Sequence, residues 1–470
     1  MIHQYINNGY HIVLDVNSGS VHSVDALLYD AVEVLAKIVP DMEKPMPLTD
    51  DQKKAVREAL VCKYSAEDIE DALSDIQELI DAEELFAADI YKDYVIDFKK
   101  RQTVVKALCL HIAHDCNLAC KYCFAEEGEY HGRRALMSFE VGKKALDFLI
   151  ANSGNRINLE VDFFGGEPLM AWDTVTQTVD YARSIEEQHG KKFRFTITTN
   201  GLLLDEDKRR YINENMDNCV LSLDGRREVN DEFRKTVAGT GSYDTIVPKF
   251  KALVDERDPN LDYYARGTFT SHNLDFANDV LSIADAGFDR LSVEPVTADP
   301  GCGYDLTEDD LPKIEAEYDR LTDIMLERKK EGKPFTFFHF MVDLDQGPCV
   351  VKRLRGCGAG YEYVAVTPDG DIYPCHQFVG KEEFKQGSVL DQSFDMDIAQ
   401  KFAGMNIYSR PKCQKCWAKF YCSGGCSAAN YNMNHDMNDS YDLGCEMERK
   451  RLECAIYLKA MDKICEEEAK

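Results

Sequence analysis

The chain has 470 residues, 17 cysteines and a formal net charge of −29 at pH 7, and this length predicts two or three domains. The excess of acidic residues argues against nucleic-acid binding, because contacts to a phosphate backbone depend on Lys and Arg. No apolar run approaches the ~20 residues that span a bilayer and the N-terminus lacks a signal-peptide pattern, so we expect no membrane segment and a cytoplasmic protein with reduced thiols.

Residues 1–95 show the pattern of a small winged-helix-like α+β domain. Two strand-like runs, 10–14 and 20–23, flank Asn17-Ser18-Gly19, which favours a hairpin turn. Helical patterns follow near residues 25–38, 50–61 and 66–80. A winged helix can bind DNA, but the many acidic residues of this region argue against it. The alternatives are a stabilising cap and a domain that binds a peptide as an added strand.

Residues 100–340 alternate strand-like and helix-like segments. Six apolar or β-branched runs cover residues 108–112, 159–164, 193–198, 219–223, 263–269 and 291–296. Helical patterns such as 139–150 and 277–286 separate them. Strands that alternate with helices predict a parallel sheet with right-handed crossovers. In parallel barrels the chemistry gathers at the C-terminal strand ends, so we expect the functional side chains there.

Three cysteines follow the first of these runs. Cys116, Cys120 and Cys123 have the spacing Cys-x3-Cys-x2-Cys, with Tyr122 before the last thiol. Thiolates are the usual protein ligands of iron–sulfur clusters, and three of them would leave one iron of a four-iron cluster free for substrate. A zinc knuckle, a disulfide cluster and unrelated core thiols are the alternatives.

Small and polar residues mark the later strand ends. They are Gly165, Gly166 and Glu167 after the second run, Thr199 and Asn200 after the third, Ser222 and Asp224 around the end of the fourth, Arg234 beyond it, and Arg266 within the fifth. Glycines allow close backbone approach. Glu167 offers an acceptor for an ammonium group, and either arginine can pair with a carboxylate.

Residues 341–470 carry a second cysteine array. Its members are Cys357, Cys375, Cys413, Cys416, Cys422, Cys426 and Cys445. A zinc ribbon is the alternative, although zinc sites rarely need so many thiols. Cys349 lies shortly before the array and is either a further ligand or a loop cysteine. We expect the other six cysteines to be ordinary core residues; they are Cys62, Cys109, Cys219, Cys302, Cys454 and Cys465.

The first cysteine loop resembles that of radical S-adenosylmethionine (SAM) enzymes, and the second array resembles their SPASM domain. The resemblance implies an α/β fold with a partial (β/α)6 barrel, and SAM and three [4Fe–4S] clusters as cofactors. The cluster on the first loop would cleave SAM to a 5′-deoxyadenosyl radical, with Tyr122 and the strand-end residues named above around SAM. The second array would hold two auxiliary clusters, one on Cys357, Cys375 and Cys426 and the other on Cys413, Cys416, Cys422 and Cys445. Either Cys349 or substrate would complete the first of them.

The whole pattern is similar to the SCIFF-peptide maturases, which belong with the sactipeptide and ranthipeptide synthases. It includes the segments Tyr5-Ile6-Asn7-Asn8-Gly9-Tyr10 and Arg355-Gly356-Cys357-Gly358-Ala359-Gly360. These enzymes form thioether crosslinks in a small cysteine-rich precursor peptide. The resemblance implies that residues 1–95 are a PqqD-like domain that binds the precursor's leader. It also implies an electron donor such as flavodoxin or ferredoxin.

Other functions remain open at this stage. Sulfatase maturases place an acidic base directly after the cysteine of the Gly-x4-Cys motif, where this chain has His376, which argues against formylglycine formation. Epimerisation and carbon–carbon crosslinking of a peptide would use the same motifs. A non-enzymatic, peptide-binding electron carrier would need only the auxiliary clusters and the N-terminal domain.

Overall fold

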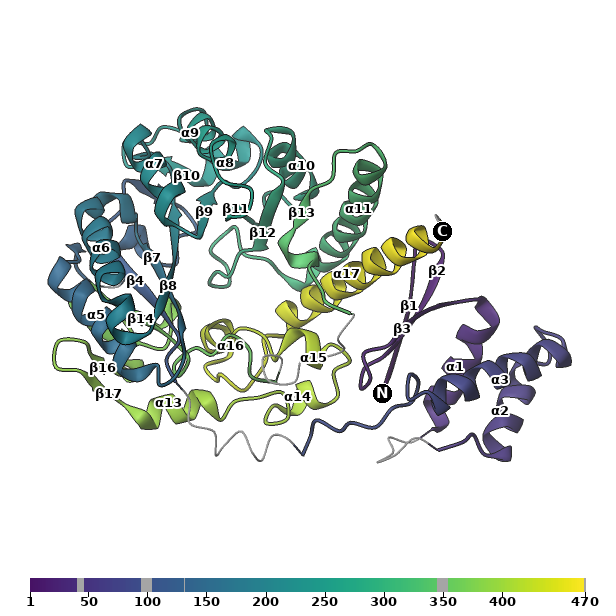
Figure 1. Cartoon of the computed structure of the whole chain (residues 1–470). Helices are drawn as coiled ribbons and strands as arrows, with labels where there is room; N and C mark the ends of the chain where they lie inside the picture. Colours follow the sequence, from purple (N-terminus) through teal and green to yellow (C-terminus); the bar gives the residue numbers. More distant parts are fainter. Residues whose placement is uncertain (40–45, 94–103, 131, 345–353, 469–470) are drawn as a thin grey trace.

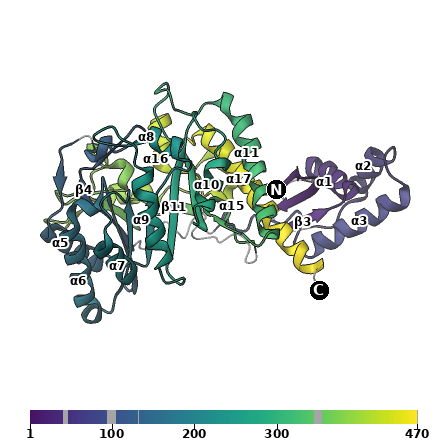
Figure 2. The same ribbon diagram turned by 90° about the horizontal axis from the view of Figure 1, so that it is seen from above.

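The computed structural model describes residues 1–39, 46–93, 104–130, 132–344 and 354–468. A curved sheet with helices on its outer face forms the larger part of the molecule, and the N-terminal unit lies at one end, beside the long C-terminal helix (Figures 1 and 2). Within the described residues, no helix combines the length and apolar character needed to cross a membrane.

The six expected strands are confirmed, and they pair in parallel in chain order. They are β4 (Ala107–His114), β7 (Asn158–Gly165), β8 (Lys192–Thr199), β9 (Asn218–Ser222), β11 (Asp262–Phe269) and β12 (Arg290–Pro295). The helices outside them are α5 (Phe139–Asn152), α6 (Trp172–His189), α7 (Glu206–Asn215), α8 (Arg227–Phe233), α9 (Tyr243–Asp255), α10 (Ala277–Asp285) and α11 (Leu311–Lys330). Short strands complete this part: β5 (Leu118–Cys120), β6 (Ala135–Leu136), β10 (Arg234–Thr236) and β13 (Thr336–Phe337).

The alternation of side chains along each strand explains this arrangement. In β7, Leu159, Val161 and Phe163 are fully buried and belong to the main hydrophobic core. The residues between them, including Asp162 and Phe164, point to the other face of the sheet, because successive side chains of a strand alternate. The apolar face is therefore covered by the helices, and the other face lines the interior of the partial barrel.

The sheet continues beyond the expected boundary at residues 340–341. Strand β14 (Tyr363–Val366) pairs in parallel with β4. It is followed by the antiparallel strands β15 (Asp371–Tyr373), β16 (Gly387–Ser388) and β17 (Ser393–Phe394). The C-terminal helices are α13 (Met396–Ala403), α14 (Pro411–Gln414), α15 (Lys419–Cys422), α16 (Ser427–Asn434) and α17 (Asp442–Glu468). The C-terminal region is thus joined to the barrel through backbone hydrogen bonds.

The N-terminal unit combines a three-stranded antiparallel sheet with three helices. Its elements are β1 (Ile2–Asn7), β2 (Tyr10–Asp15), β3 (Val21–Val24), α1 (Ala26–Ile38), α2 (Asp50–Leu60) and α3 (Ala66–Asp81). The expected hairpin and helices are confirmed, whereas β1 was missed. Its signal was the Asn8–Gly9 pair, whose φ angles of 48° and 81° are those of a tight turn between antiparallel strands.

The N-terminal sheet shares a hydrophobic core with the C-terminal region. Ile12 and Leu14 belong to one buried cluster with Cys413, Phe420 and Ile456. His3 stacks on Trp417 with ring centroids 3.8 Å apart, and its Nε2 lies 2.9 Å from the Glu453 carboxylate. The N-terminal unit therefore packs against the C-terminal region and does not have a wholly separate core.

The cysteines outside the two arrays divide into two kinds. Cys109, Cys219 and Cys454 are buried as expected, but Cys62, Cys302 and Cys465 are exposed, so the expectation was wrong for these three. Cys62 follows the end of α2, Cys302 lies in the loop between Gly301 and Gly303, and Cys465 lies near the end of α17. Apolar character alone does not bury a thiol in a loop or at a helix end.

The shared core gives a testable expectation. Ile12→Ala should lower the free energy of unfolding by about 2–5 kcal/mol, the usual cost of a cavity of this kind. Because Ile12 is fully buried between two regions of the chain, the change should also speed amide hydrogen exchange in α15 and α17. Ile76→Ala is the control, since Ile76 is equally buried but packs only within the N-terminal unit. Equal exchange in α15 and α17 for both variants would contradict the shared core.

Candidate active site

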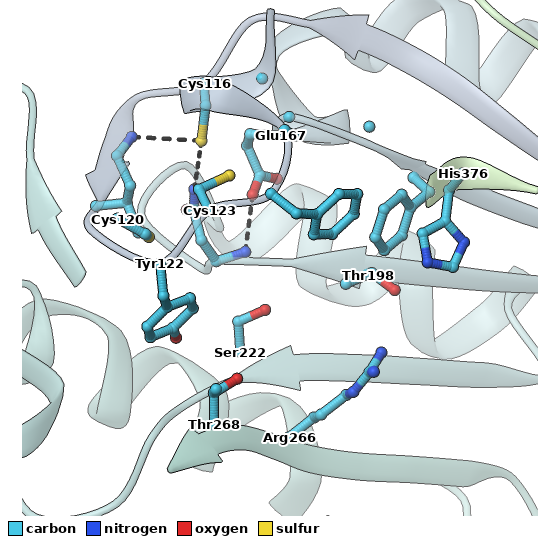
Figure 3. A pocket seen from close by; sticks show the side chains of 18 of the residues that line it. Cys116, Cys120, Tyr122, Cys123, Glu167, Thr198, Ser222, Arg266, Thr268 and His376 are labelled. Atoms are coloured by element: carbon cyan, nitrogen blue, oxygen red, sulfur yellow. Dashed lines mark hydrogen bonds between the residues drawn. The ribbon is translucent and has the colours of Figure 1, made fainter. Parts of the chain in front are cut away.

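A cavity of about 250 Å³ opens at the C-terminal ends of the parallel strands. Cys116, Cys120 and Cys123 line one side of it, and Figure 3 shows side chains from several strands converging on the same space. Nine further residues expected at the site also line it: Tyr122, Gly165, Gly166, Glu167, Thr199, Asn200, Ser222, Arg234 and Arg266. The structure therefore brings together residues that are up to 150 positions apart in the chain.

The three thiols lie on a loop that is held by strand pairing and by hydrogen bonds to sulfur. Strand β5, which ends at Cys120, pairs antiparallel with β10. The Leu118 N–H donates to Cys116 Sγ at 3.4 Å, and Asn200 Nδ2 donates to the same sulfur at 3.6 Å. Burial raises the pKa of the Cys116 and Cys120 thiols to about 12. Iron ligation favours the thiolate and displaces the proton, and N–H groups directed at sulfur are typical of cluster sites.

The glycine pair packs directly against this loop. A Cβ atom on Gly166 would lie 2.1 Å from the carbonyl oxygen of Asp115, and one on Gly165 would lie 2.4 Å from that of Ala113. Gly165 also has a φ of +123°, which other residues rarely adopt. The two glycines therefore allow β7 to approach the cysteine loop and leave backbone exposed to the cavity, as close approach of a cofactor requires.

Glu167 ties the ends of two strands together. Its carboxylate accepts hydrogen bonds from Leu169 N at 3.0 Å, Thr199 Oγ1 at 2.8 Å and Asn200 N at 2.7 Å. The side chain is 1% exposed, and burial raises the pKa of its carboxyl to about 7, against the effect of those hydrogen bonds. Glu167 thus has a structural role in addition to the ammonium-accepting role expected for it.

Asp224 does not line the cavity. It is fully buried and forms an ion pair with Arg234, with 3.0 Å between Arg234 Nε and its Oδ1. Its other oxygen accepts a hydrogen bond of 2.6 Å from the Tyr122 hydroxyl, and Thr268 N donates to Oδ1 at 3.0 Å. Asp224 therefore positions Tyr122 and Arg234, the two residues through which it acts on the cavity.

Charged and aromatic residues form the side of the cavity opposite the cysteines (Figure 3). Arg266 Nη2 donates to Glu294 Oε2 at 2.7 Å. His376 packs against Phe124 and Phe164, with ring centroids 5.5 and 5.2 Å away. Burial and the nearby charge of Arg266 lower the pKa of His376 to about 4, so its imidazole is neutral near pH 7.

Sequence reasoning missed Thr198, Thr268 and Glu294 as cavity residues. For Thr268 a signal was present, because it follows Arg266 by two positions in β11. Residues two apart in a strand face the same side. Once a strand and one of its cavity residues are known, this period predicts which other residues at the strand end face the cavity.

The second array forms two groups of thiols. The first auxiliary group is Cys357, Cys375 and Cys426. Burial raises the pKa of Cys375, and the thiols of Cys426 and Cys357 are close enough to raise it further. The second auxiliary group is Cys413, Cys416, Cys422 and Cys445. Burial raises the pKa of Cys422 and Cys445 to about 11, and thiols of the same group add to it. The thiols expected to share a cluster are thus near one another, while the ligand sets themselves stay predictions and Cys349 lies outside the described residues.

The donor chemistry of both regions fits iron–sulfur clusters. The cysteine loop and both auxiliary groups consist of thiols. N–H donors point at Cys116 Sγ, and a guanidinium nitrogen of Arg449 lies 4.0 Å from Cys416 Sγ. In the described part of the chain, no three His, Cys, Asp or Glu side chains are arranged to hold a single metal ion.

Comparison with family models assigns the two regions. Residues 110–263 match the model of the Radical SAM superfamily, and residues 357–417 match SPASM, an iron–sulfur cluster-binding domain. The chain therefore combines a radical SAM domain with a SPASM domain. These two domains imply SAM and [4Fe–4S] clusters as cofactors.

Similar proteins share this architecture. The chain is 24% identical, over 350 residues, to the cysteine-type anaerobic sulfatase-maturating enzyme of Clostridium novyi (strain NT), covering 71% of this chain and 90% of the relative. The solved structure of native anSMEcpe with bound AdoMet has a TM-score of 0.62, 20% identity and coverage of 76% of this chain and 99% of its own. Streptococcus suis SuiB bound to precursor peptide SuiA has a TM-score of 0.54, 16% identity and coverage of 94% and 98%. The two solved structures confirm the expected α/β fold class.

The buried ion pair behind the cavity can be tested by unfolding. Asp224→Asn leaves Arg234, whose side chain is only 12% exposed, without a counter-charge; breaking a buried pair in this way typically costs about 3–5 kcal/mol. Urea unfolding should show a loss of this size. The control is Asp244→Asn, which removes the partner of Arg227 in an exposed pair 2.7 Å apart and should cost under ~1 kcal/mol. A loss at Asp224 no larger than that at Asp244 would refute the positioning role.

Glu167 should make stability depend on pH. Its carboxyl has an ordinary pKa of 4.5 and a folded pKa of about 7, so the stability contributed by its neutral form is present below pH 4.5 and is lost as the pH rises to about 7. In cluster-free protein, the free energy of unfolding of the wild type minus that of Glu167→Gln should therefore fall across this range. The control is Glu140→Gln, because the side chain of Glu140 is exposed. A pH-independent difference for Glu167→Gln would contradict the raised pKa.

Proposed function

We propose that this chain is a radical SAM enzyme that forms intramolecular thioether crosslinks in a small, ribosomally made, cysteine-rich precursor peptide. The crosslink would join a cysteine sulfur to a backbone or side-chain carbon. One observation carries the proposal: a single cavity extends from Cys116, Cys120 and Cys123 to His376, which follows Cys375 of the first auxiliary group. A peptide in this cavity would lie between a radical source and an acceptor of sulfur and electrons.

The residues divide between the cofactors as follows. Cys116, Cys120 and Cys123 would hold the first [4Fe–4S] cluster, and the glycine backbone and strand-end side chains would hold SAM beside it. When bound, these cofactors supply a 5′-deoxyadenosyl radical that takes a hydrogen atom from the substrate. The two auxiliary groups would hold the second and third clusters, and either Cys349 or a substrate thiolate would complete the first auxiliary site.

The chain's own residues would orient the peptide and keep the electron balance. Joining C–H and S–H groups into a C–S bond removes one hydrogen atom, one proton and one electron from the peptide. The hydrogen atom leaves with 5′-deoxyadenosine, and the electron passes to the auxiliary sites. The Arg266–Glu294 pair presents both charges to the cavity and is suited to hold the amide groups of an extended peptide. Such orientation brings the reacting atoms within reach of one another.

Peptide substrates are supported by the names of similar proteins. SuiB is described bound to a precursor peptide, and the Clostridium novyi relative is named as a sulfatase-maturating enzyme. We propose that residues 1–95 bind the precursor's leader at an edge of the β1–β2–β3 sheet through main-chain hydrogen bonds. We also propose a small electron-transfer protein, such as flavodoxin or ferredoxin, as the reductant.

The activity is tested with anaerobically reconstituted protein, SAM, a reductant and a candidate cysteine-rich peptide. We expect 5′-deoxyadenosine, a peptide mass lower by two hydrogens, and loss of one cysteine's reactivity toward iodoacetamide. The protein should contain about twelve irons, and the triple change of Cys116, Cys120 and Cys123 to Ala should remove about four of them, given four irons per cluster, together with all SAM cleavage.

Other outcomes identify the alternatives. An unchanged peptide mass with an inverted residue would indicate epimerisation, and a loss of two hydrogens with every thiol still reactive would indicate a carbon–carbon crosslink. An aldehyde at a cysteine position would indicate formylglycine formation. Absence of 5′-deoxyadenosine from the iron-loaded wild type would indicate an electron carrier.

A further inference from the structure

Arg410 is a buried cation at the start of α14. It is 3% exposed. Its guanidinium donates hydrogen bonds to the carbonyl oxygen of Gly424 and, at 3.2 Å, to the hydroxyl of Ser427, and it lies 3.9 Å from the sulfur of Met405. Its Nε has no hydrogen-bond partner within the part of the chain that the structure describes. Among the residues that the structure describes, no carboxylate forms an ion pair with it.

This lack of a counter-ion is unusual for an arginine near these sites. Arg234 pairs with Asp224, Arg266 pairs with Glu294, and Arg226 pairs with Asp279. Taking a charge out of water without an opposite charge is costly. The groups that contact the Arg410 guanidinium, a carbonyl, a hydroxyl and a thioether, are neutral. Nearby thiols that became thiolates, as they would on binding iron, would supply an opposite charge.

Thiols of both auxiliary groups lie near enough to Arg410 for a negative charge on them to raise its pKa. Cys413, Cys422 and Cys445 are members of the second group, and Cys426 is a member of the first. The backbone between Cys422 and Cys426 joins the two groups, and it is the carbonyl of Gly424 in this segment that accepts a hydrogen bond from the guanidinium.

The connecting segment is shaped to accept the guanidinium. Gly424 has a φ of +89°, and a Cβ atom there would lie 2.2 Å from Nη1 of Arg410. The close approach therefore requires glycine at this position, and it holds the positive charge where the chain passes from one group of thiols to the other.

We propose that Arg410 is the shared counter-ion of the two auxiliary clusters, a positioning residue whose fixed charge raises the reduction potential of both. The inference rests on the proposed function to the extent that both thiol groups hold clusters. A cluster with several thiolate ligands carries net negative charge, and reduction adds one more electron. A nearby cation stabilises the reduced form more than the oxidised form, because cluster potentials depend on local charge and hydrogen bonds.

This role fits the electron balance of the proposed reaction. Formation of the C–S bond releases one electron from the peptide, and a site that accepts it must have a potential that is high enough. One cation placed between the two groups raises both potentials together, so that either auxiliary site accepts the electron from the peptide more readily.

The test compares Arg410→Lys, which keeps the charge, with Arg410→Gln, which keeps a hydrogen-bond donor without the charge. Iron content and the potentials of the three clusters are measured in reconstituted full-length protein by redox titration followed by electron paramagnetic resonance. We expect Arg410→Gln to shift both auxiliary couples to more negative potentials and Arg410→Lys to stay close to the wild type. The couple of the cluster on Cys116, Cys120 and Cys123 should not shift in either variant.

Arg257→Gln is the matched control. Arg257 is 7% exposed and also has neutral partners, the carbonyl oxygens of Met216 and Asp262 at 2.9 and 3.0 Å, but none of the thiols of either auxiliary group is among them. Its loss should leave all three potentials unchanged.

Three results would overturn the inference. The first is wild-type auxiliary potentials in iron-loaded Arg410→Gln, and the second is an equal shift in Arg410→Lys and Arg410→Gln. The third is equal loss of auxiliary iron from both variants, whereas loss from Arg410→Gln alone would support the role of the charge. Wild-type protein without auxiliary clusters would overturn both this inference and the proposed cluster sites. A shift as expected in an enzyme that forms no thioether would refute the proposed reaction alone.

Discussion

Strand β4 is the element on which the arrangement of the site depends. It pairs in parallel with β7 on one side and with β14 on the other, and every one of its residues is buried. Its end leads into the loop that carries Cys116, and its partner β7 ends at the two glycines that pack against that loop. Its partner β14 begins the sheet that leads to Cys375. The same backbone hydrogen bonds therefore hold the radical SAM loop, its glycine pair and the first auxiliary group in one frame.

A second constraint acts between the ends of the chain. Ile12 and Leu14 of the N-terminal sheet share a core with Cys413 and Phe420, so the unit proposed to bind the leader also packs against one member of the second auxiliary group. Removal of apolar surface from water drives this contact. In consequence, the N-terminal unit and the SPASM domain stabilise one another, and the unit is more than a tethered binding domain.

Arginine charge is balanced differently in the cavity and near the auxiliary groups. In the cavity, Arg234 and Arg266 each have a carboxylate partner, which balances the charge of both arginines before cofactors or peptide enter. Near the auxiliary groups, Arg410 has no such partner within the described residues, and the neighbouring thiols are groups able to supply negative charge. The contrast matters because burying an ion without an opposite charge nearby is costly.

The sequence by itself determined the features that depend on neighbouring residues in the chain. The six strands were predictable from apolar runs, the cluster loop from the spacing of Cys116, Cys120 and Cys123, and the glycine pair from its place after a strand. These signals are local, because strand period and ligand spacing are properties of short segments.

Only the tertiary structure decided which distant segments meet. It placed β14 beside β4, Glu294 and His376 in the cavity, and Asp224 behind its wall. It also left Cys62 and Cys302 exposed and Arg410 buried. Sheet neighbours and burial arise from contacts between distant residues, such as that of Ala107 with Tyr363. The free energy of such a contact depends on the packing of the whole fold. No local pattern in the sequence therefore predicts it.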